Sequence, residues 1–286
     1  MEASATRAPI TPAEVTLSVA DLDRSIDYYG NAIGLSVNER ANGGARLGVP
    51  GRDLVVLEEQ PGARPGRGTN TGLFHLALLV PERRDLAAWL AHAAETGVRL
   101  SGASDHFVSE ALYLRDPDGH GIEIYRDRPR DTWTRASDGS LNMGTEPLDL
   151  HDVMTARDSS QPFERMPDGT VMGHIHLQVS RLPEARRFYS DLLGLDVMVE
   201  IPGQASFLSS GGYHHHLGMN TWAGVGAPPA PPDQARLRRA ALVVDDRDEL
   251  DRIEARLADG GAEPVRDGDR VLVEDPSRNP LELRAA

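Results

Sequence analysis

The sequence predicts an α+β protein that is built from four βαβββ modules. Internal repeats are the main observation behind this prediction. Residues 17–37 match residues 177–197, and Leu17 corresponds to Leu177 at an offset of 160. Residues 75–98 match residues 239–262 in the same way. Similarity at a fixed offset indicates that one unit of structure has been repeated.

Each repeat begins with alternating apolar residues, which are typical of a β-strand. A helix follows in the first repeat, because Leu22, Ile26, Tyr29 and Ile33 recur at spacings of three and four residues. Gly34 then stands where a left-handed helix cap is expected.

The second and fourth repeats end alike. Asp116–Tyr125 has the sequence DPDGHGIEIY and Asp275–Arg284 has DPSRNPLELR, so each combines a tight turn with an alternating strand. The predicted modules cover roughly residues 13–58, 72–127, 172–220 and 238–286.

The modules group into two predicted domains. An N-terminal domain spans residues 12–128 and a C-terminal domain spans residues 172–286. Residues 129–171 between them are polar and rich in Asp, Ser, Thr and Pro, which predicts a linker or arm.

Composition excludes several classes of function. The chain has 286 residues and no cysteine, so disulfides and thiolate metal sites are excluded. A net charge of −14 argues against binding to nucleic acid or to an anionic membrane. No apolar run is long enough to cross a bilayer, and the first residues do not resemble a signal peptide. We therefore expect a cytoplasmic protein.

The repeated units resemble the vicinal oxygen chelate superfamily over nearly the whole chain. The resemblance implies two cupped mixed-sheet barrels, in which paired modules surround one metal ion. Ligands in that superfamily come from the first and last strands of the modules. Its members include glyoxalases, antibiotic-resistance proteins and extradiol dioxygenases, so the fold alone does not determine the function.

The ligand positions of the superfamily carry over to three residues. The first-strand ligand lies five residues before the valine that ends the strand, which points to His75 and His174. The last-strand ligand corresponds to Glu123. Two histidines and one carboxylate suit Fe(II) with open positions for substrate and oxygen. With neutral imidazoles the site would carry a charge of +1, which suits an anionic catecholate.

The other two modules lack this set. Their first-strand positions are Glu14 and Arg239, and only Glu282 matches a last-strand ligand. We interpret Glu282 as a structural relic. Because both histidines and Glu123 must converge, we predict that the second module pairs with the third around the site. The first module would then pair with the fourth in a barrel without metal.

Further residues resemble the acid–base groups of extradiol dioxygenases. The string GYHHHLGMN places that family's active-site histidine on His215. His216 is the alternative, because strand alternation would put neighbouring histidines on opposite faces. Tyr113 lies ten residues before Glu123, as in that family, and His106 precedes it with a spacing that departs by about two residues from the family pattern.

The chain is most similar to a subgroup of catechol 2,3-dioxygenase-like proteins. The resemblance implies an Fe(II)-dependent extradiol dioxygenase that cleaves catechol or a substituted catechol and inserts both atoms of O2. Mn(II) is an alternative metal, a small aromatic diol and O2 are the implied partners, and a homo-oligomer is expected. Two other functions stay open: a glyoxalase-like isomerase or lyase, and a metal-free protein that sequesters a small molecule.

Two further histidines have expected positions. His176 shares a strand face with His174 and is expected to line the same pocket. His120 lies in the Asp-Pro turn and is expected to be exposed to solvent.

Overall fold

The computed structural model describes residues 9–137 and 139–286, and these form four successive βαβββ modules. The first module contains β1 (Ile10–Val19), α1 (Leu22–Asp27), η1 (Tyr28–Ile33), β2 (Ser36–Ala41), β3 (Gly44–Val49) and β4 (Arg52–Glu59). The second contains β5 (Gly72–Leu79), α2 (Arg83–Thr96), β6 (Gly102–Asp105), β7 (Ser109–Arg115) and β8 (Gly121–Asp127).

The second half of the chain repeats this order. The third module contains β10 (Val171–Gln178), α4 (Leu182–Arg186), η3 (Arg187–Leu192), β11 (Asp196–Ile201), β12 (Ala205–Ser209) and β13 (Leu217–Asn220). The fourth contains β14 (Leu237–Val244), α5 (Arg247–Asp259), β15 (Val265–Asp267), β16 (Arg270–Glu274) and β17 (Pro280–Ala285). The segment between the halves contains η2 (Arg130–Thr132), β9 (Glu146–Pro147) and α3 (Leu150–Met154).

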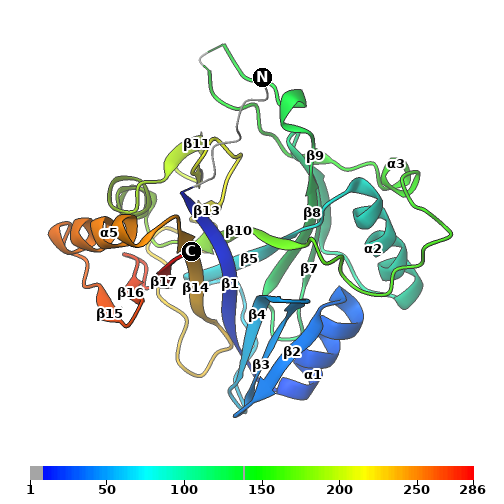
Figure 1. Cartoon of the computed structure of the whole chain (residues 1–286), viewed down its shortest axis with the longest axis horizontal. Helices are drawn as coiled ribbons and strands as arrows, with labels where there is room; N and C mark the ends of the chain where they lie inside the picture. Colours follow the sequence, from blue (N-terminus) through cyan, green and yellow to red (C-terminus); the bar gives the residue numbers. More distant parts are fainter. Residues whose placement is uncertain (1–8, 138) are drawn as a thin grey trace.

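The strands form two curled mixed sheets, and this confirms the predicted fold class. One sheet has the order β15-β16-β17-β14-β1-β4-β3-β2, and the other has the order β11-β12-β13-β10-β5-β8-β7-β6-β9. The first sheet therefore joins modules 1 and 4, whereas the second joins modules 2 and 3. Figure 1 shows the blue strand β1 beside the orange strand β14, although they lie at opposite ends of the sequence.

The predicted pairing of modules is thus confirmed. The two joints are antiparallel, β1 against β14 and β5 against β10. Inside each module the first and last strands are parallel neighbours, as in β5 with β8. Each sheet draws on both halves of the chain, so the division into domains at 12–128 and 172–286 stays a prediction.

The helices pack on the sheets through apolar faces. Helix α2 buries Leu86, Trp89 and Leu90, and the indole N–H of Trp89 donates to the carbonyl of Ala32 at 3.2 Å. Gly34 ends η1 with a φ of 92°, which is the left-handed cap that the sequence predicts. In Figure 1, α2 and α5 lie on opposite sides of the molecule. None of the described helices is long and apolar enough to cross a membrane.

Each Asp-Pro turn is tied to the helical segment of the preceding module. The hydroxyl of Tyr29 donates to Asp116 at 3.2 Å, and the hydroxyl of Tyr189 donates to Asp275 at 2.9 Å. All four side chains are buried. Burial raises the pKa of Asp116 and of Asp275. The repeat therefore extends beyond the backbone to one buried hydrogen bond in each half.

The expectation that His120 is exposed is wrong. The residue is 5% exposed, and its Nε2 donates to the carbonyl oxygen of Ser18 at 3.0 Å. Asp118, in the same turn, forms an ion pair with Arg24 at 2.8 Å. The turn is thus docked against the first module, and the local turn sequence carries no sign of this long-range contact.

Candidate metal centre

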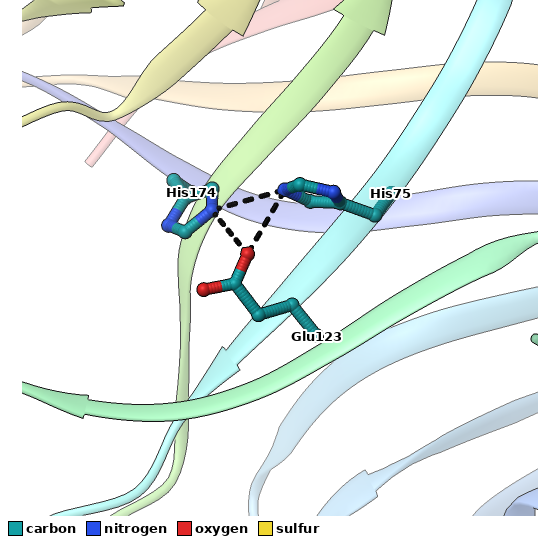
Figure 2. Close-up of side chains that lie close together, drawn as sticks. All are labelled: His75, Glu123 and His174. Carbon is teal, nitrogen blue, oxygen red and sulfur yellow. Dashed lines mark hydrogen bonds and ion pairs between the residues drawn. The ribbon is translucent and has the colours of Figure 1, made fainter. Parts of the chain in front are cut away.

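Three neighbouring strands of one sheet bring His75, Glu123 and His174 together (Figure 2). Nε2 of His75 lies 3.2 Å from Nε2 of His174. Oε2 of Glu123 lies 3.0 Å from the first nitrogen and 3.1 Å from the second. All three side chains are buried. The sequence-predicted ligand set therefore converges on one point, from β5, β8 and β10.

The register of the β5–β10 joint explains this convergence. His75 lies directly opposite His176, and His174 lies opposite Ala77. The register shifts on both sides of this stretch, between Met172 and His174 and between His176 and Leu177. Such bulges re-aim side chains beside functional sites.

The spacing of the three donor atoms fits a metal ion. Adjacent ligands of an octahedral ion with bonds of about 2.1 Å lie about 3.0 Å apart, whereas those of a tetrahedral ion lie about 3.4 Å apart. The observed distances of 3.0, 3.1 and 3.2 Å are of this size, so the three atoms could hold one metal ion. Two imidazoles and a carboxylate on one face of such an ion leave the other positions open for exogenous ligands.

The electrostatics of the site favour a neutral His174 beside an ionised Glu123. Burial alone would raise the pKa of the Glu123 carboxyl, but His174 and His75 hold it well below its ordinary value. Burial lowers the pKa of His174 from 6.5 to about 4, against the opposing effect of Glu123. A metal ion needs deprotonated ligands, so these shifts leave Glu123 and His174 in the form that binds metal at neutral pH.

We expect the metal-free protein to lose stability as the pH is lowered from 7.5 to 5. Burial also lowers the pKa of His216 to about 3. In the unfolded chain both histidines become protonated below about pH 6.5. In the folded protein His174 is protonated only near pH 4 and His216 only near pH 3. The free energy of unfolding must fall as the pH decreases through this window. Thermal unfolding with chelator at pH 7.5, 6 and 5 measures the effect.

The control for this prediction is His216→Asn, which replaces the ring by a side chain that does not titrate. Its amide oxygen can still accept from the backbone N–H of Ser210, as Nδ1 does at 3.3 Å. The dependence of Tm on pH should be shallower in this variant. A wild-type Tm that is constant from pH 7.5 to pH 5 would contradict the prediction.

A cavity of about 470 Å³ opens in front of the trio. Its walls are largely aromatic and aliphatic, with Phe74, Leu114, Ile122, Met143, Val199, Ile201, Phe207 and Trp222 among the lining residues. Polar residues also line the cavity, and Tyr113, His176 and His215 lie next to the trio. A largely apolar cavity with a small convergent polar set is the usual form of a small-molecule site.

His215 lines this cavity and His216 does not. The ring of His215 lies 4.1 Å from that of His174, between centroids. His216 lines a different hollow, and its Nδ1 lies 3.0 Å from the hydroxyl of Ser209. The predicted strand alternation is wrong here, because β13 begins only at Leu217 and the three histidines lie in an irregular segment.

Tyr113 and His106 form a hydrogen-bonded pair on the cavity wall. The hydroxyl of Tyr113 lies 2.7 Å from Nε2 of His106, and Nδ1 of His106 donates to the carbonyl oxygen of Gly144 at 2.7 Å. With the His106 proton on Nδ1, its Nε2 accepts the hydrogen bond from Tyr113. Burial and the nearby Glu123 carboxylate raise the pKa of Tyr113, so it keeps its proton. The irregular spacing of His106 in the sequence does not prevent this contact.

The segment between the halves also contributes to the cavity, which sequence reasoning missed. Met143, Gly144 and Thr145 line it, and β9 extends the same sheet beside β6. The polar composition of this segment indicates a linker and carries no signal of a site.

His176 lines the cavity as expected. Its Nε2 accepts a hydrogen bond from the amide of Asn220 at 3.0 Å. Its ring packs against Phe74 at 5.1 Å and against Trp222 at 5.6 Å, between centroids. Burial, together with His75, holds the pKa of His176 well below its ordinary value. It is thus a neutral wall residue beside the trio.

The other sheet carries a counterpart of the trio in which guanidinium groups neutralise the carboxylates. Glu282 pairs with Arg239 at 3.0 Å and with Arg284 at 3.2 Å. Arg284 also binds both carboxylate oxygens of Glu14 at 2.6 Å. An arginine already occupies the first-strand position that would have to supply a neutral ligand. The arrangement agrees with the interpretation of Glu282 as a structural relic.

Comparisons with known proteins agree with this architecture. The family model of the glyoxalase/bleomycin resistance protein/dioxygenase superfamily matches residues 11–124 and 171–283. A catechol-2,3-dioxygenase of Bacillus subtilis (strain 168) is 41% identical over 264 residues, which are 91% of this chain and 92% of that protein.

Two solved structures share the fold at low sequence identity. A Bacillus subtilis protein provisionally called a dioxygenase has a TM-score of 0.67 and 15% identity, and the match covers 96% of this chain and 84% of that one. Glyoxalase I of Zea mays has a TM-score of 0.59 and 16% identity, with 98% and 94% covered. Both the family model and the 41% identical relative span most of the sequence, so the chain belongs to the glyoxalase/bleomycin resistance protein/dioxygenase superfamily.

Proposed function

We propose that this protein is an extradiol ring-cleaving dioxygenase that holds Fe(II) on His75, His174 and Glu123. The observation that carries the proposal is a facial set of two histidines and one carboxylate at the base of a largely apolar cavity. This donor set is diagnostic of non-haem Fe(II) oxygenases. The 41% identical relative named catechol-2,3-dioxygenase supports the same chemistry. Mn(II) is the alternative metal.

The remaining polar groups of the cavity suit the handling of a catechol. His215 is neutral, because burial and the neighbouring His174 lower its pKa. It can therefore accept a proton from a substrate hydroxyl. Tyr113 keeps its hydroxyl proton and is held by His106 at 2.7 Å. Its oxygen is thereby fixed beside the trio, where it can accept a hydrogen bond from a hydroxyl of the substrate.

The overall reaction balances without another cofactor. The ring carbon–carbon bond beside the two hydroxyls breaks, both oxygen atoms of O2 enter the product, and the substrate carbon is oxidised. Bound Fe(II) supplies the positive charge that holds a catecholate and the electronic connection between substrate and O2. The aromatic walls exclude water from the reacting groups.

Oxygen uptake is the experiment that tests the proposal. The protein is loaded with Fe(II) under anaerobic conditions and then mixed with oxygenated buffer and a panel of catechols. We expect one O2 to be consumed for each ring opened, with the product seen by its absorbance. Zinc in the purified protein, isomerisation of a thiohemiacetal and no oxygen uptake would instead support a glyoxalase-like enzyme.

The cavity walls also restrict the substrate. Apart from histidines, Arg115 is the one cationic residue among the described residues that line the cavity. Its guanidinium donates to the carbonyl of Gly119 at 2.9 Å. Among the described lining residues, Arg115 is thus the one permanent cation that a ring carboxylate could meet. Phe207, Trp222 and Ile201 offer apolar surface instead. We therefore propose a catechol with no substituent or an apolar one. The cytoplasmic location and the homo-oligomer stay predictions.

We expect kcat/KM for a 4-alkylcatechol to exceed that for 3,4-dihydroxybenzoate by about 10–10²-fold, because the largely apolar walls would desolvate a carboxylate that does not reach Arg115. Steady-state oxygen uptake with both substrates measures the ratio. An equal or reversed preference would contradict the assignment of the walls. The proposal for ring cleavage would survive that result.

A further inference from the structure

Three consecutive histidines have three different surroundings. His215 lines the cavity, whereas His216 lines a separate hollow. His214 lies behind His215 and its side chain is fully buried. The function proposed above uses His215 alone and gives His214 no role.

Hydrogen bonds connect His214 to a carboxylate on one side and to His215 on the other. Nε2 of His214 lies 2.9 Å from Oδ1 of Asp127. Nδ1 of His214 lies 2.7 Å from Nδ1 of His215. Asp127 is the last residue of β8, four positions after Glu123. One strand therefore carries both the carboxylate of the metal trio and the outer end of this chain of hydrogen bonds.

The direction of each bond follows from the chemistry of the groups. An ionised carboxylate only accepts, so Nε2 of His214 donates to Asp127. A neutral His214 then has a bare Nδ1, which can only accept. Nδ1 of His215 must therefore carry the proton that it donates to His214. The bare nitrogen of His215 is then Nε2, which has no hydrogen-bond partner among the described residues.

The His214 ring is fixed in place by its aromatic neighbours. Trp133 packs over His214 at 5.4 Å and Tyr213 packs at 4.0 Å, between ring centroids. The His174 ring lies 6.3 Å away on the side of the trio. The two hydrogen bonds of His214 are therefore held in one geometry.

We propose that Asp127 and His214 are positioning residues that hold His215 in the tautomer with a bare Nε2. The catalytic consequence rests on the proposed function, in which His215 accepts a proton from the substrate. The hydrogen-bond chain keeps the accepting nitrogen free before the substrate arrives. In a catalytic triad a carboxylate orients a histidine base directly. Here Asp127 would orient His215 through one further imidazole, that of His214.

Nitrogen-15 NMR of the histidine side chains tests the tautomer directly in the full-length, metal-free protein. The His215 signal is identified by its loss in His215→Asn. We expect Nε2 of His215 to be unprotonated and Nδ1 to be protonated in the wild type. A proton on Nε2 in the wild type would overturn the proposal. The measurement needs no turnover, so it decides the question even if the protein does not cleave catechols.

Asp127→Asn tests the positioning role. Its amide can donate to His214, which permits the reversed chain of bonds and a proton on Nε2 of His215. We expect a mixed tautomer and a fall in kcat of about 10–10²-fold, with KM and bound metal unchanged. Asp131→Asn is the matched control, because Asp131 is an exposed aspartate close by in the sequence.

Two outcomes would count against the positioning role. One is an Asp127→Asn protein that retains both the wild-type tautomer and the wild-type kcat. The other is a loss of kcat with an unchanged tautomer, which would indicate a general structural role. If no variant and no wild-type protein consumes oxygen, the proposed function fails while the tautomer result stands.

Discussion

Replacing Glu123 by glutamine should remove most of the bound iron, whereas the same change at Glu282 should leave it in place. Glu123 supplies one of three ligand atoms, and a neutral amide oxygen also removes the negative charge that the metal needs. We expect metal affinity to fall by more than the roughly 10²-fold that is usual for residues merely supporting a ligand. Ring cleavage should fall with it. Metal analysis after anaerobic loading and gel filtration measures the loss.

Glu282 is a suitable control because it occupies the position in the fourth module that Glu123 occupies in the second. It is buried like Glu123, but its partners are Arg239, Arg270 and Arg284. His75→Ala and His174→Ala should lose iron as Glu123→Gln does. Iron retained in Glu123→Gln and lost in Glu282→Gln would show that the site has been assigned to the wrong sheet.

His215→Asn should keep iron and lose on the order of 10²–10⁴ in kcat, the usual range for a lost acid–base group. The substitution removes the ring that lines the cavity and leaves the three proposed ligands intact. Single-turnover oxygen uptake with preloaded protein separates this loss from any loss of metal.

His216→Asn is the matched control, since it changes the next residue in the same segment but faces another hollow. We expect it to retain most of the wild-type kcat. A full loss of activity in His216→Asn, with an active His215→Asn, would show that His216 and not His215 is the acid–base residue.

The fold was predictable because its repeats are visible in the sequence. Leu17 and Leu177 mark the same position in two modules, and the Asp-Pro turns mark the ends of the second and fourth modules. The pairing of modules also followed, from the requirement that His75 and His174 share one metal. The structure confirms that pairing, with β5 beside β10.

Details that depend on distant contacts were not predictable. The burial of His120 results from a turn docked on Ser18, which lies 102 positions earlier in the sequence. The strand expected around His214 is absent, because glycines at 211 and 212 adopt positive φ values and β13 starts at Leu217. Sequence alternation cannot reveal either effect.

The acid–base surroundings were predictable only in part. Tyr113 and His215 came from motif positions, and the structure places both on the cavity. Asp127 gave no signal, because an aspartate at the end of a strand is an ordinary residue. Its role emerges only when the His214 ring is seen between it and the site. Gly144 likewise belongs to a segment whose composition indicates a linker.

The crossed pairing of modules has a consequence for the order in which the chain folds during synthesis. The second and third modules follow one another, so the sheet with the metal trio has all its strands once Asn220 has emerged. The first module must wait for the fourth, since Ile10 of β1 pairs with Val244 of β14. Closing so long a loop is slow. Until then β1 presents an open edge, the kind of surface on which nascent chains aggregate.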